Sequence, residues 1–211
     1  KNKTSYNFSI GTDWKENLLN KAKRLNFYDK LLVQDNNFAL KIETESIKNI
    51  YSNSIYWVEN IDLHLQELHR VLVKGGALLL HLKTNEMIKV HPSNLSLEFA
   101  SKQTLELLDR GRLSSWKSIK SIDWFLKKFE NYKFKIEVVK PIYAREQVMA
   151  WHYGLRPFSH ILVKIFNKLE ISERTKIKNE FIQTISPIVK DLADLEPSNK
   201  DTFEYIIKLV K

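Results

Sequence analysis

The sequence has 211 residues, of which 43% are hydrophobic and 11% aromatic, so it can bury a sizeable core and is not a wholly disordered chain. It contains no cysteine, which excludes disulfides, thiolate-bound metals and cysteine nucleophiles. No apolar run is long enough to span a membrane and no signal peptide is evident, so we expect a cytoplasmic protein.

The formal net charge is +9, a balance that can indicate nucleic acid or an acidic membrane surface as a partner. Lysine accounts for 27 of the 34 basic residues, however, and arginine for only 7. Specific readout of bases favours arginine, and the lysines alternate with acidic residues along most of the chain. The charge pattern therefore argues against nucleic-acid binding, although a basic protein that binds or methylates RNA remains a third, weaker hypothesis.

The first half of the chain alternates predicted strands and helices. Residues 6–12 are predicted as a strand, and Asp13 and Glu16 resemble a capping box at the start of a helix that ends near Leu25. Short apolar strands are expected at residues 30–34 and 47–51.

A helix follows at about residues 62–74, with Gly75 in the position of a helix C-terminal glycine. His64 and His69 are expected on the surface of this helix. Residues 77–82 (ALLLHL) are predicted as a strand buried on both faces, with His81 as a core histidine. Strands that alternate with helices indicate βαβ units and a parallel sheet.

The second half is more helical. Ser121 is a candidate N-cap for one helix, and residues 133–142 alternate like a strand. Two helical stretches at about residues 146–169 and 172–195 contain possible interruptions at Gly154, Pro157 and Pro187, and residues 202–210 form a last predicted strand. A helical segment between two late strands suggests an insertion or a lid.

Polar residues follow the first three predicted strands, where ligands of open parallel sheets bind. The Asp13 carboxylate, after an early strand, can accept hydrogen bonds from two ribose hydroxyls. The neighbouring Trp14 offers a flat face to a purine, and Asp35 can accept a hydrogen bond from an exocyclic amine. Asp13 could instead be only a helix cap and Trp14 only a core anchor. The candidate nucleoside-binding residues are Asp13, Trp14, Asp35, Asn36, Ser52 and Asn53.

Residues 47–84 read IKNIYSNSIYWVENIDLHLQELHRVLVKGGALLLHLKT, in which RVLVKGG spans residues 70–76. This run resembles the class I S-adenosylmethionine-dependent methyltransferases (type 11/25-like), whose fourth strand is followed by a helix that ends in a similar motif and then by the fifth strand. Residues 10–14 resemble the family's second strand with its ribose-binding acid, and residues 34–36 resemble the third-strand turn that holds the adenine.

The resemblance implies an α/β fold: a Rossmann-like seven-stranded sheet, mostly parallel with an antiparallel last strand, and a helical insertion between strands six and seven. Residues 1–142 and 202–211 would form the methyltransferase domain, and residues 143–201 an accessory lid. S-adenosylmethionine would be the cofactor and S-adenosylhomocysteine its product. The expected activity is methyl transfer to a small-molecule or glycan-like acceptor.

One departure from the family is clear, because its glycine-rich cofactor loop is missing and no G-x-G occurs in the sequence. Only 12 residues precede Asp13, whereas in dinucleotide-binding folds the acid lies about 20 residues beyond that loop. The first strand would be the centre of the sheet, so we expect that the sequence represents only part of a longer protein. The alternative is a non-catalytic binding or scaffold protein that has lost the cofactor loop.

Methyl transfer requires alignment of the two reactants, no metal, and for some acceptors a general base. His91, in the loop after the fifth strand, and His152, in the accessory segment, are the candidates for that base. Tyr153 and Arg156 are candidates for acceptor binding, although the segment could simply pack the lid onto the core and Arg156 could cap a helix. An exposed segment at residues 151–153 could also mediate pairing of two copies.

Overall fold

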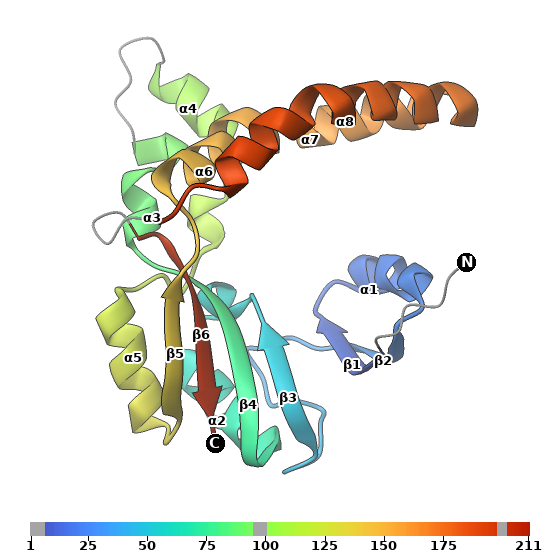
Figure 1. Cartoon of the computed structure of the whole chain (residues 1–211). Helices are drawn as coiled ribbons and strands as arrows, with labels where there is room; N and C mark the ends of the chain where they lie inside the picture. Colours follow the sequence, from blue (N-terminus) through green and yellow to red (C-terminus); the bar gives the residue numbers. More distant parts are fainter. Residues whose placement is uncertain (1–6, 95–100, 198–201) are drawn as a thin grey trace.

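A computed structural model describes residues 7–94, 101–197 and 202–211. Its strands form two separate sheets (Figure 1). The smaller sheet pairs two parallel strands, β1 (Phe8–Asp13) and β2 (Tyr28–Val33). The larger sheet has the order β3-β4-β6-β5, and its members are β3 (Ile47–Ser52), β4 (Leu72–Lys83), β6 (Glu204–Val210) and β5 (Lys135–Pro141).

The larger sheet is mixed, because β3 and β4 are parallel whereas β6 runs antiparallel to both β4 and β5. The predicted single sheet of seven strands is not seen, since the described residues contain six strands in two sheets. Within these residues β1 pairs only with β2 and β3 only with β4, so each leaves one edge without a strand partner. These edges are where the expected central strand would pair.

The helices divide into three groups. The first contains α1 (Glu16–Ala22), which continues as a short 3-10 turn, and the second contains α2 (Ile61–Val71) and α5 (Ile122–Asn131), which pack on the larger sheet. The third lies beyond the carboxyl end of β4 and consists of α3 (Glu86–Lys89), α4 (Lys102–Asp109), α6 (Arg145–Met149), α7 (Arg156–Lys168) and α8 (Ile171–Ala193). In the chain, α6 to α8 lie between β5 and β6.

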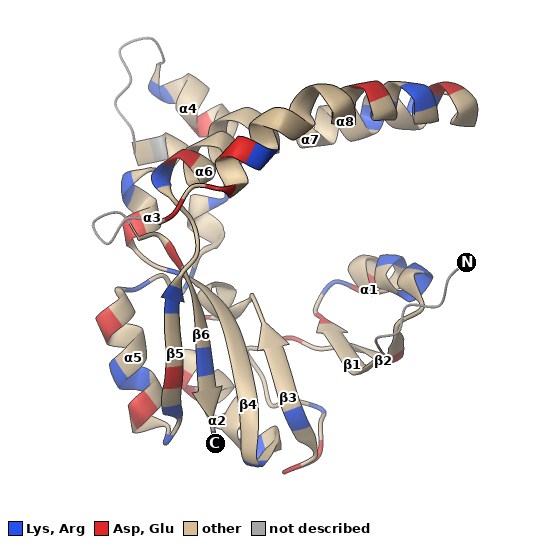
Figure 2. Cartoon of the chain, in the orientation of Figure 1, with Lys and Arg blue, Asp and Glu red and all other residues tan. Residues whose placement is uncertain are grey.

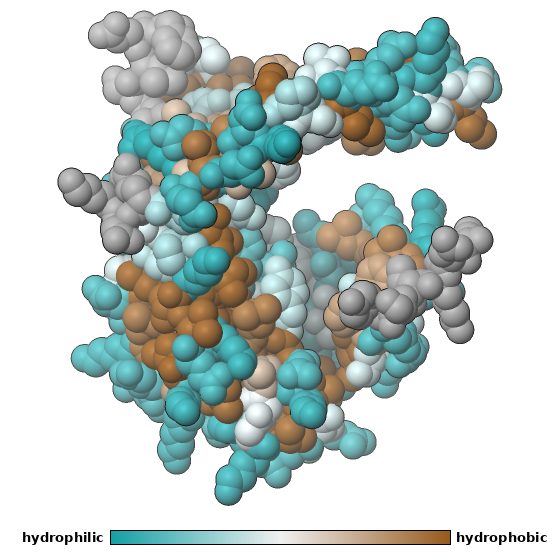
Figure 3. Space-filling model, viewed as in Figure 1, coloured by the Kyte–Doolittle hydropathy of each residue, from teal (hydrophilic) through white to brown (hydrophobic). Residues whose placement is uncertain are grey.

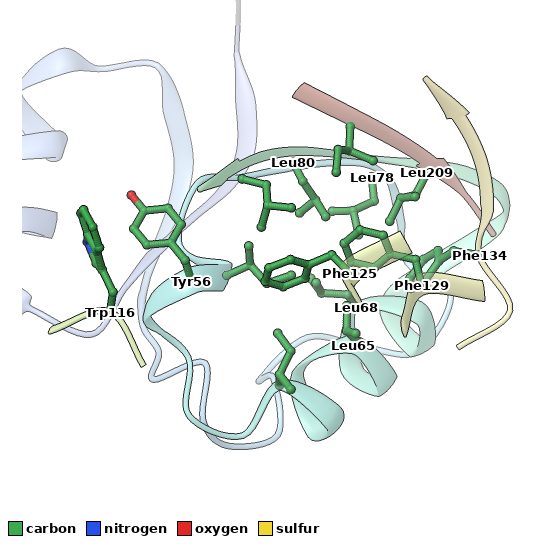
Figure 4. Close-up of a cluster of buried hydrophobic side chains, with 14 of the residues drawn as sticks. Tyr56, Leu65, Leu68, Leu78, Leu80, Trp116, Phe125, Phe129, Phe134 and Leu209 are labelled. Carbon is green, nitrogen blue, oxygen red and sulfur yellow. The ribbon is translucent and has the colours of Figure 1, made fainter. Parts of the chain in front are cut away.

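The hydrophobic core lies between the larger sheet and the helices α2 and α5 (Figure 4). Leu78, Leu80 and Leu82 alternate along β4 and are fully buried. Phe125 and Phe129 of α5 are also fully buried, with their rings stacked 6.0 Å apart. This helix begins as predicted, since the Ser121 hydroxyl accepts a hydrogen bond from the Trp124 backbone N–H.

The opposite face of the larger sheet is open, so the prediction that β4 is buried on both faces is wrong. Leu79 is 38% exposed and Tyr51 60% exposed. Figure 3 shows a hydrophobic surface over this part of the sheet. In the described residues α2 and α5 cover only one face, which is why the apolar run of β4 alternates between buried and partly exposed side chains.

Other local predictions on the first half of the chain are also wrong. The helix α2 ends at Val71, and Gly75 lies inside β4 with a positive φ of 75°. A terminal glycine is not needed, because the backbone N–H groups of Glu45 and Ser46 donate to the carbonyls of Arg70 and Val71. Nor is His64 on the surface, since it is 2% exposed against the core.

The helices α7 and α8 form a hairpin that projects away from the sheets (Figure 1). Pro157 lies in the first turn of α7, where a proline is tolerated, and Gly154 lies in a π-helical segment, Ala150–Leu155. Pro187 is inside α8 and does not end it. As Figure 2 shows, basic and acidic residues are interspersed on α5 and α8, in agreement with the diffuse charge of the sequence.

Candidate functional site

The carboxyl ends of β1 and β2 lie next to each other. The Gln34 backbone N–H donates to the carbonyl of Asp13 at 3.0 Å, which holds the turn after β2 beside the end of β1. The half-buried Asp13 carboxylate accepts from the Lys15 N–H through Oδ1. Asp13 is therefore not the N-cap that the sequence predicted: the N-cap position is Lys15, and α1 begins at Glu16.

Polar side chains connect the turns after β2 and β3. The Asn36 amide donates to the Ser54 hydroxyl at 3.1 Å, and Ser54 lies 3.2 Å from the Ser52 hydroxyl. The Asp35 carboxylate accepts from the backbone and the side chain of Asn37, which fixes the shape of the turn. The structure thus links Asn36 and Ser52, two of the candidate nucleoside-binding residues, through the Ser54 hydroxyl.

Two of the predicted residues face solvent without joining this network. The Trp14 side chain is 59% exposed, so the alternative that it anchors the core is wrong. The Lys15 ammonium lies over the Trp14 ring, 4.9 Å from its centre. Asn53 is exposed. The strand ends therefore offer carboxylate and amide groups and one flat aromatic face, a set that can hold a nucleoside.

A buried polar cluster lies beyond the carboxyl end of β4. The His91 Nε2 is 2.9 Å from Asp109 Oδ1, and the His91 ring packs edge-on against Trp116 at 5.2 Å and against His152 at 5.4 Å. His91 and His152 are both almost completely buried. The two histidines that the sequence proposed as alternative bases are therefore neighbours.

The two predicted acceptor-binding residues border the same cluster. The Tyr153 hydroxyl donates to the carbonyl of Val90 at 3.3 Å. The Arg156 guanidinium donates through Nη2 to the carbonyls of Leu108 and Asp109 at 2.6 and 3.0 Å, and so attaches α7 to the end of α4.

Burial sets the protonation of these groups. Desolvation is the main reason that the pKa of His152 falls to about 3, with smaller contributions from nearby cations, and burial also lowers the pKa of His91. Burial raises the pKa of Tyr153 to about 12. At neutral pH both histidines are uncharged, so each has one ring nitrogen that can accept a hydrogen bond.

Sequence reasoning missed a second buried ion pair beside this cluster. The Lys83 ammonium contacts the Glu204 carboxylate, which also contacts the His81 ring. His81 is thus satisfied, as expected, although it points away from the core face of β4 and is only partly buried. The Lys83 ammonium also lies 5.6 Å from the centre of the Tyr56 ring.

Aromatic rings link the strand-end turns to the histidine cluster. Tyr56 lies two residues beyond Ser54, in the 3-10 turn after β3, and its ring lies 6.3 Å from Trp116. Trp116 in turn lies 6.3 Å from His152. Figure 4 shows Tyr56 between Trp116 and the leucines of the core.

A hollow with a volume of about 430 Å³ lies elsewhere, between α1 and β2, and is lined by residues such as Leu19, Asn20 and Tyr28. Its lining includes none of the strand-end residues or the histidine cluster. In the described part of the chain, no three His, Asp or Glu side chains are grouped so that they could hold a metal ion.

In open α/β sheets, ligands bind beyond the carboxyl ends of the parallel strands, where these polar residues lie. Residues 3–80 match the family model of the methyltransferase domain. The match over residues 3–80 and the shared fold support the predicted resemblance to the class I S-adenosylmethionine-dependent methyltransferases and imply S-adenosylmethionine as the cofactor.

Solved structures share the fold at low sequence identity. An S-adenosylmethionine-dependent methyltransferase from Mesorhizobium loti is 13% identical with a TM-score of 0.54, and the match covers 97% of this chain and 80% of that one. A protein of Bacillus halodurans C-125 classed as a methyltransferase is 14% identical with a TM-score of 0.51, covering 96% and 82%. The [4+2]-cyclase SpnF is 12% identical with a TM-score of 0.54, covering 97% and 67%.

No curated protein matches the chain significantly. None of the helices that the structure describes has both the length and the apolar character of a membrane span. The sheet order of the described strands, β2-β1 and β3-β4-β6-β5, leaves the place of the expected central strand between β1 and β3.

Proposed function

We propose that this protein transfers a methyl group from S-adenosylmethionine to a small-molecule or glycan-like acceptor. The observation that carries the proposal is a chain of aromatic contacts beside the strand-end turns. It runs from Tyr56 through Trp116 to His152, with 6.3 Å between successive rings. A cofactor held at the strand-end turns would lie beside one end of this chain, and its acceptor would lie toward the histidines.

The residues present fit the nucleoside half of the cofactor. In the described residues the Asp13 side chain accepts one backbone hydrogen bond, through Oδ1, which leaves Oδ2 for ribose hydroxyls. Asp35 and Asn36 offer an acceptor and a carbonyl to the base, Ser52 and Asn53 add short polar groups, and the exposed face of Trp14 can stack on a purine. When bound, S-adenosylmethionine would supply an electrophilic methyl group.

The buried cluster is the proposed acceptor side. His152 is the better candidate for the base, because neither of its ring nitrogens has a hydrogen-bond partner in the residues described. His91 would position it, since the Asp109 carboxylate holds the His91 ring edge-on against His152. Tyr153 and Arg156 would border the acceptor, and residues 143–201 would act as the accessory lid over a domain made of residues 1–142 and 202–211.

A non-catalytic binding or scaffold role is the second candidate. Its basis is that no G-x-G occurs in these 211 residues, a count that would support it only for a complete chain. Pairing of two copies through Trp151, which is 47% exposed, would fit either role and is tested by the molar mass in solution.

Calorimetric titration with S-adenosylmethionine and S-adenosylhomocysteine distinguishes the two roles. We expect micromolar binding of both, weakened about tenfold or more in Asp13→Asn, because a hydrogen bond to a charged group contributes about 1.5–3 kcal/mol. Asp191→Asn on the exposed surface of α8 removes the same charge and should leave affinity unchanged. A chain that binds neither compound would contradict the proposal and favour the scaffold.

A further inference from the structure

Among the residues that the structure describes, the polar cluster beyond β4 contains more cations than carboxylates. The cations are Lys83, Arg112 and Arg156, with Arg110 close to Arg156, and the carboxylates are Asp109 and Glu204. Both neighbouring histidines are uncharged at neutral pH because burial lowers their pKa. The cluster therefore has a surplus positive charge in a largely buried place, which an anion would offset.

Both carboxylates of the cluster already have ion-pair or hydrogen-bond partners. Glu204 contacts Lys83 with one oxygen and His81 with the other. Asp109 Oδ1 lies 2.9 Å from the His91 ring and accepts from the Leu113 backbone N–H. Neither of these carboxylates forms an ion pair with an arginine of the cluster in the part of the chain that is described.

The guanidinium groups of Arg112 and Arg156 retain unused donors. The Nε of each is buried and has no hydrogen-bond partner among the described residues. The Nη2 of Arg156 donates to backbone carbonyls, which are neutral. The Arg112 guanidinium stacks on the Trp116 ring at 5.9 Å, and the Arg112 side chain is partly exposed, so a ligand can reach it.

The two arginines act on the same space as the proposed base. Arg112 exerts an electrostatic effect on Lys83, His91, His152 and Arg156, and Arg156 acts on both histidines. A planar guanidinium over an aromatic ring is suited to bind a carboxylate in two-point fashion.

We propose that Arg112 and Arg156 bind a carboxylate of the methyl acceptor, so that the protein acts on acidic small molecules. This inference rests on the proposed function, because it assigns the cluster to the acceptor. The acceptor would lie on the exposed side of Arg112, next to the packed rings of Trp116 and His152. The bound carboxylate would also offset Lys83, Arg112 and Arg156, which lower the pKa of His152.

The test uses benzoate as the acidic probe and benzamide as its neutral counterpart of the same shape. Binding is measured by calorimetry at millimolar probe, in the full chain and in Arg112→Gln. We expect benzoate to bind, benzamide not to bind, and Arg112→Gln to weaken benzoate at least tenfold. Arg24→Gln, an exposed arginine near the end of α1, removes the same charge and should bind benzoate normally. Equal binding of benzoate and benzamide, or equal loss in both variants, would overturn the proposal.

A second measurement distinguishes loss of benzoate binding from loss of the folded structure. The ring resonances of His152, followed by nuclear magnetic resonance at neutral pH where benzoate is charged, should shift when benzoate is added and stay unchanged with benzamide. The benzoate-induced shift should be lost in Arg112→Gln, while the rest of the spectrum remains that of the folded protein. No response of His152 to benzoate in the folded protein would contradict the assigned site.

Parallel titrations with S-adenosylmethionine identify the source of the carboxylate. If Arg112→Gln weakens benzoate but leaves S-adenosylmethionine affinity unchanged, the arginines belong to the acceptor, as proposed. If the variant loses S-adenosylmethionine affinity to the same extent, the arginines bind the carboxylate of the cofactor, and the acceptor assignment is wrong. A chain that binds benzoate selectively but no S-adenosylmethionine would contradict the proposed function while leaving the anion site in place.

Discussion

The two sheets differ in how they are stabilised. In the larger sheet, Leu78, Leu80, Ile207 and Leu209 are fully buried against α2 and α5. In the smaller unit of β1, β2 and α1, only Leu19 is buried, and the strand residues are partly or largely exposed. The nucleoside-binding candidates Asp13 and Trp14 thus lie on weakly packed elements, whereas the histidine cluster lies over the well-packed sheet.

This difference indicates that the larger sheet supplies most of the folding free energy and that the smaller unit depends on it. Hydrogen bonds connect the two. The Asn36 side-chain amide donates to the Ser54 hydroxyl, and the Asn37 side-chain oxygen accepts from the backbone N–H groups of Glu59 and Asn60. A ligand that bridges the strand ends would add contacts where the fold has few, and binding energy would then stabilise the smaller unit.

The largest difference in stability is expected between two side-chain truncations, one in each region. Phe129→Ala should destabilise the protein by about 3–5 kcal/mol, because this ring is fully buried and a cavity would remain. Leu25→Ala, where the side chain is 56% exposed at the end of α1, should change stability by less than about 0.5 kcal/mol. Urea unfolding measures both, and similar losses would refute the comparison.

The buried His64 should make the stability of the larger unit depend on pH. Burial lowers the pKa of His64 from 6.5 to about 4, so the unfolded chain binds its proton first as the pH falls. The stability from this group is complete above pH 6.5 and is lost toward pH 4, a loss of about 3 kcal/mol. In His64→Leu, the unfolding free energy lost between pH 6.5 and pH 4 should be smaller by about 3 kcal/mol. If the pH dependence of stability is the same in both proteins, His64 is not its cause.

Two serine caps provide a smaller test with matched chemistry. Ser121 and Ser101 each accept a hydrogen bond at 3.2 Å from a backbone N–H, at the start of α5 and α4 respectively. Ser121→Ala should cost about 1 kcal/mol of global stability, because α5 packs on the core. Ser101→Ala should cost less in the same urea experiment, since α4 is largely exposed.

The smallest effect on stability is expected at Trp14. Its side chain is 59% exposed, so Trp14→Ala should change the free energy of unfolding by less than about 0.5 kcal/mol. Affinity for S-adenosylmethionine should nevertheless fall, by about 1 kcal/mol for the lost stacking. A variant with unchanged affinity would remove Trp14 from the proposed site.

Local patterns in the sequence were sufficient to predict the strands and the strand-end turns. Hydrophobic runs and turn residues located β1 to β6 within a few residues, and the Ser121 cap was correct. The end of α2 was misplaced, because its last carbonyls bond to Glu45 and Ser46, which are distant in sequence and could not be foreseen. The location of His64 depends likewise on packing from the rest of the fold.

The cluster was only half predictable. His91, His152, Tyr153 and Arg156 were proposed because histidines and arginines near strand ends are chemically suitable, and the structure brings them together. Asp109, Arg112 and Trp116 lie in a segment without a motif, and they join the site only through tertiary contacts. Likewise, the Lys83 contact with Glu204 joins residues that are 121 positions apart.

The structure of the protein bound to S-adenosylhomocysteine would test the central claim most directly. We predict that the ribose hydroxyls lie within hydrogen-bond distance of Asp13 and that the sulfur atom faces Trp116 and His152. A ligand bound in the hollow between α1 and β2, with its sulfur away from the histidine cluster, would contradict the account.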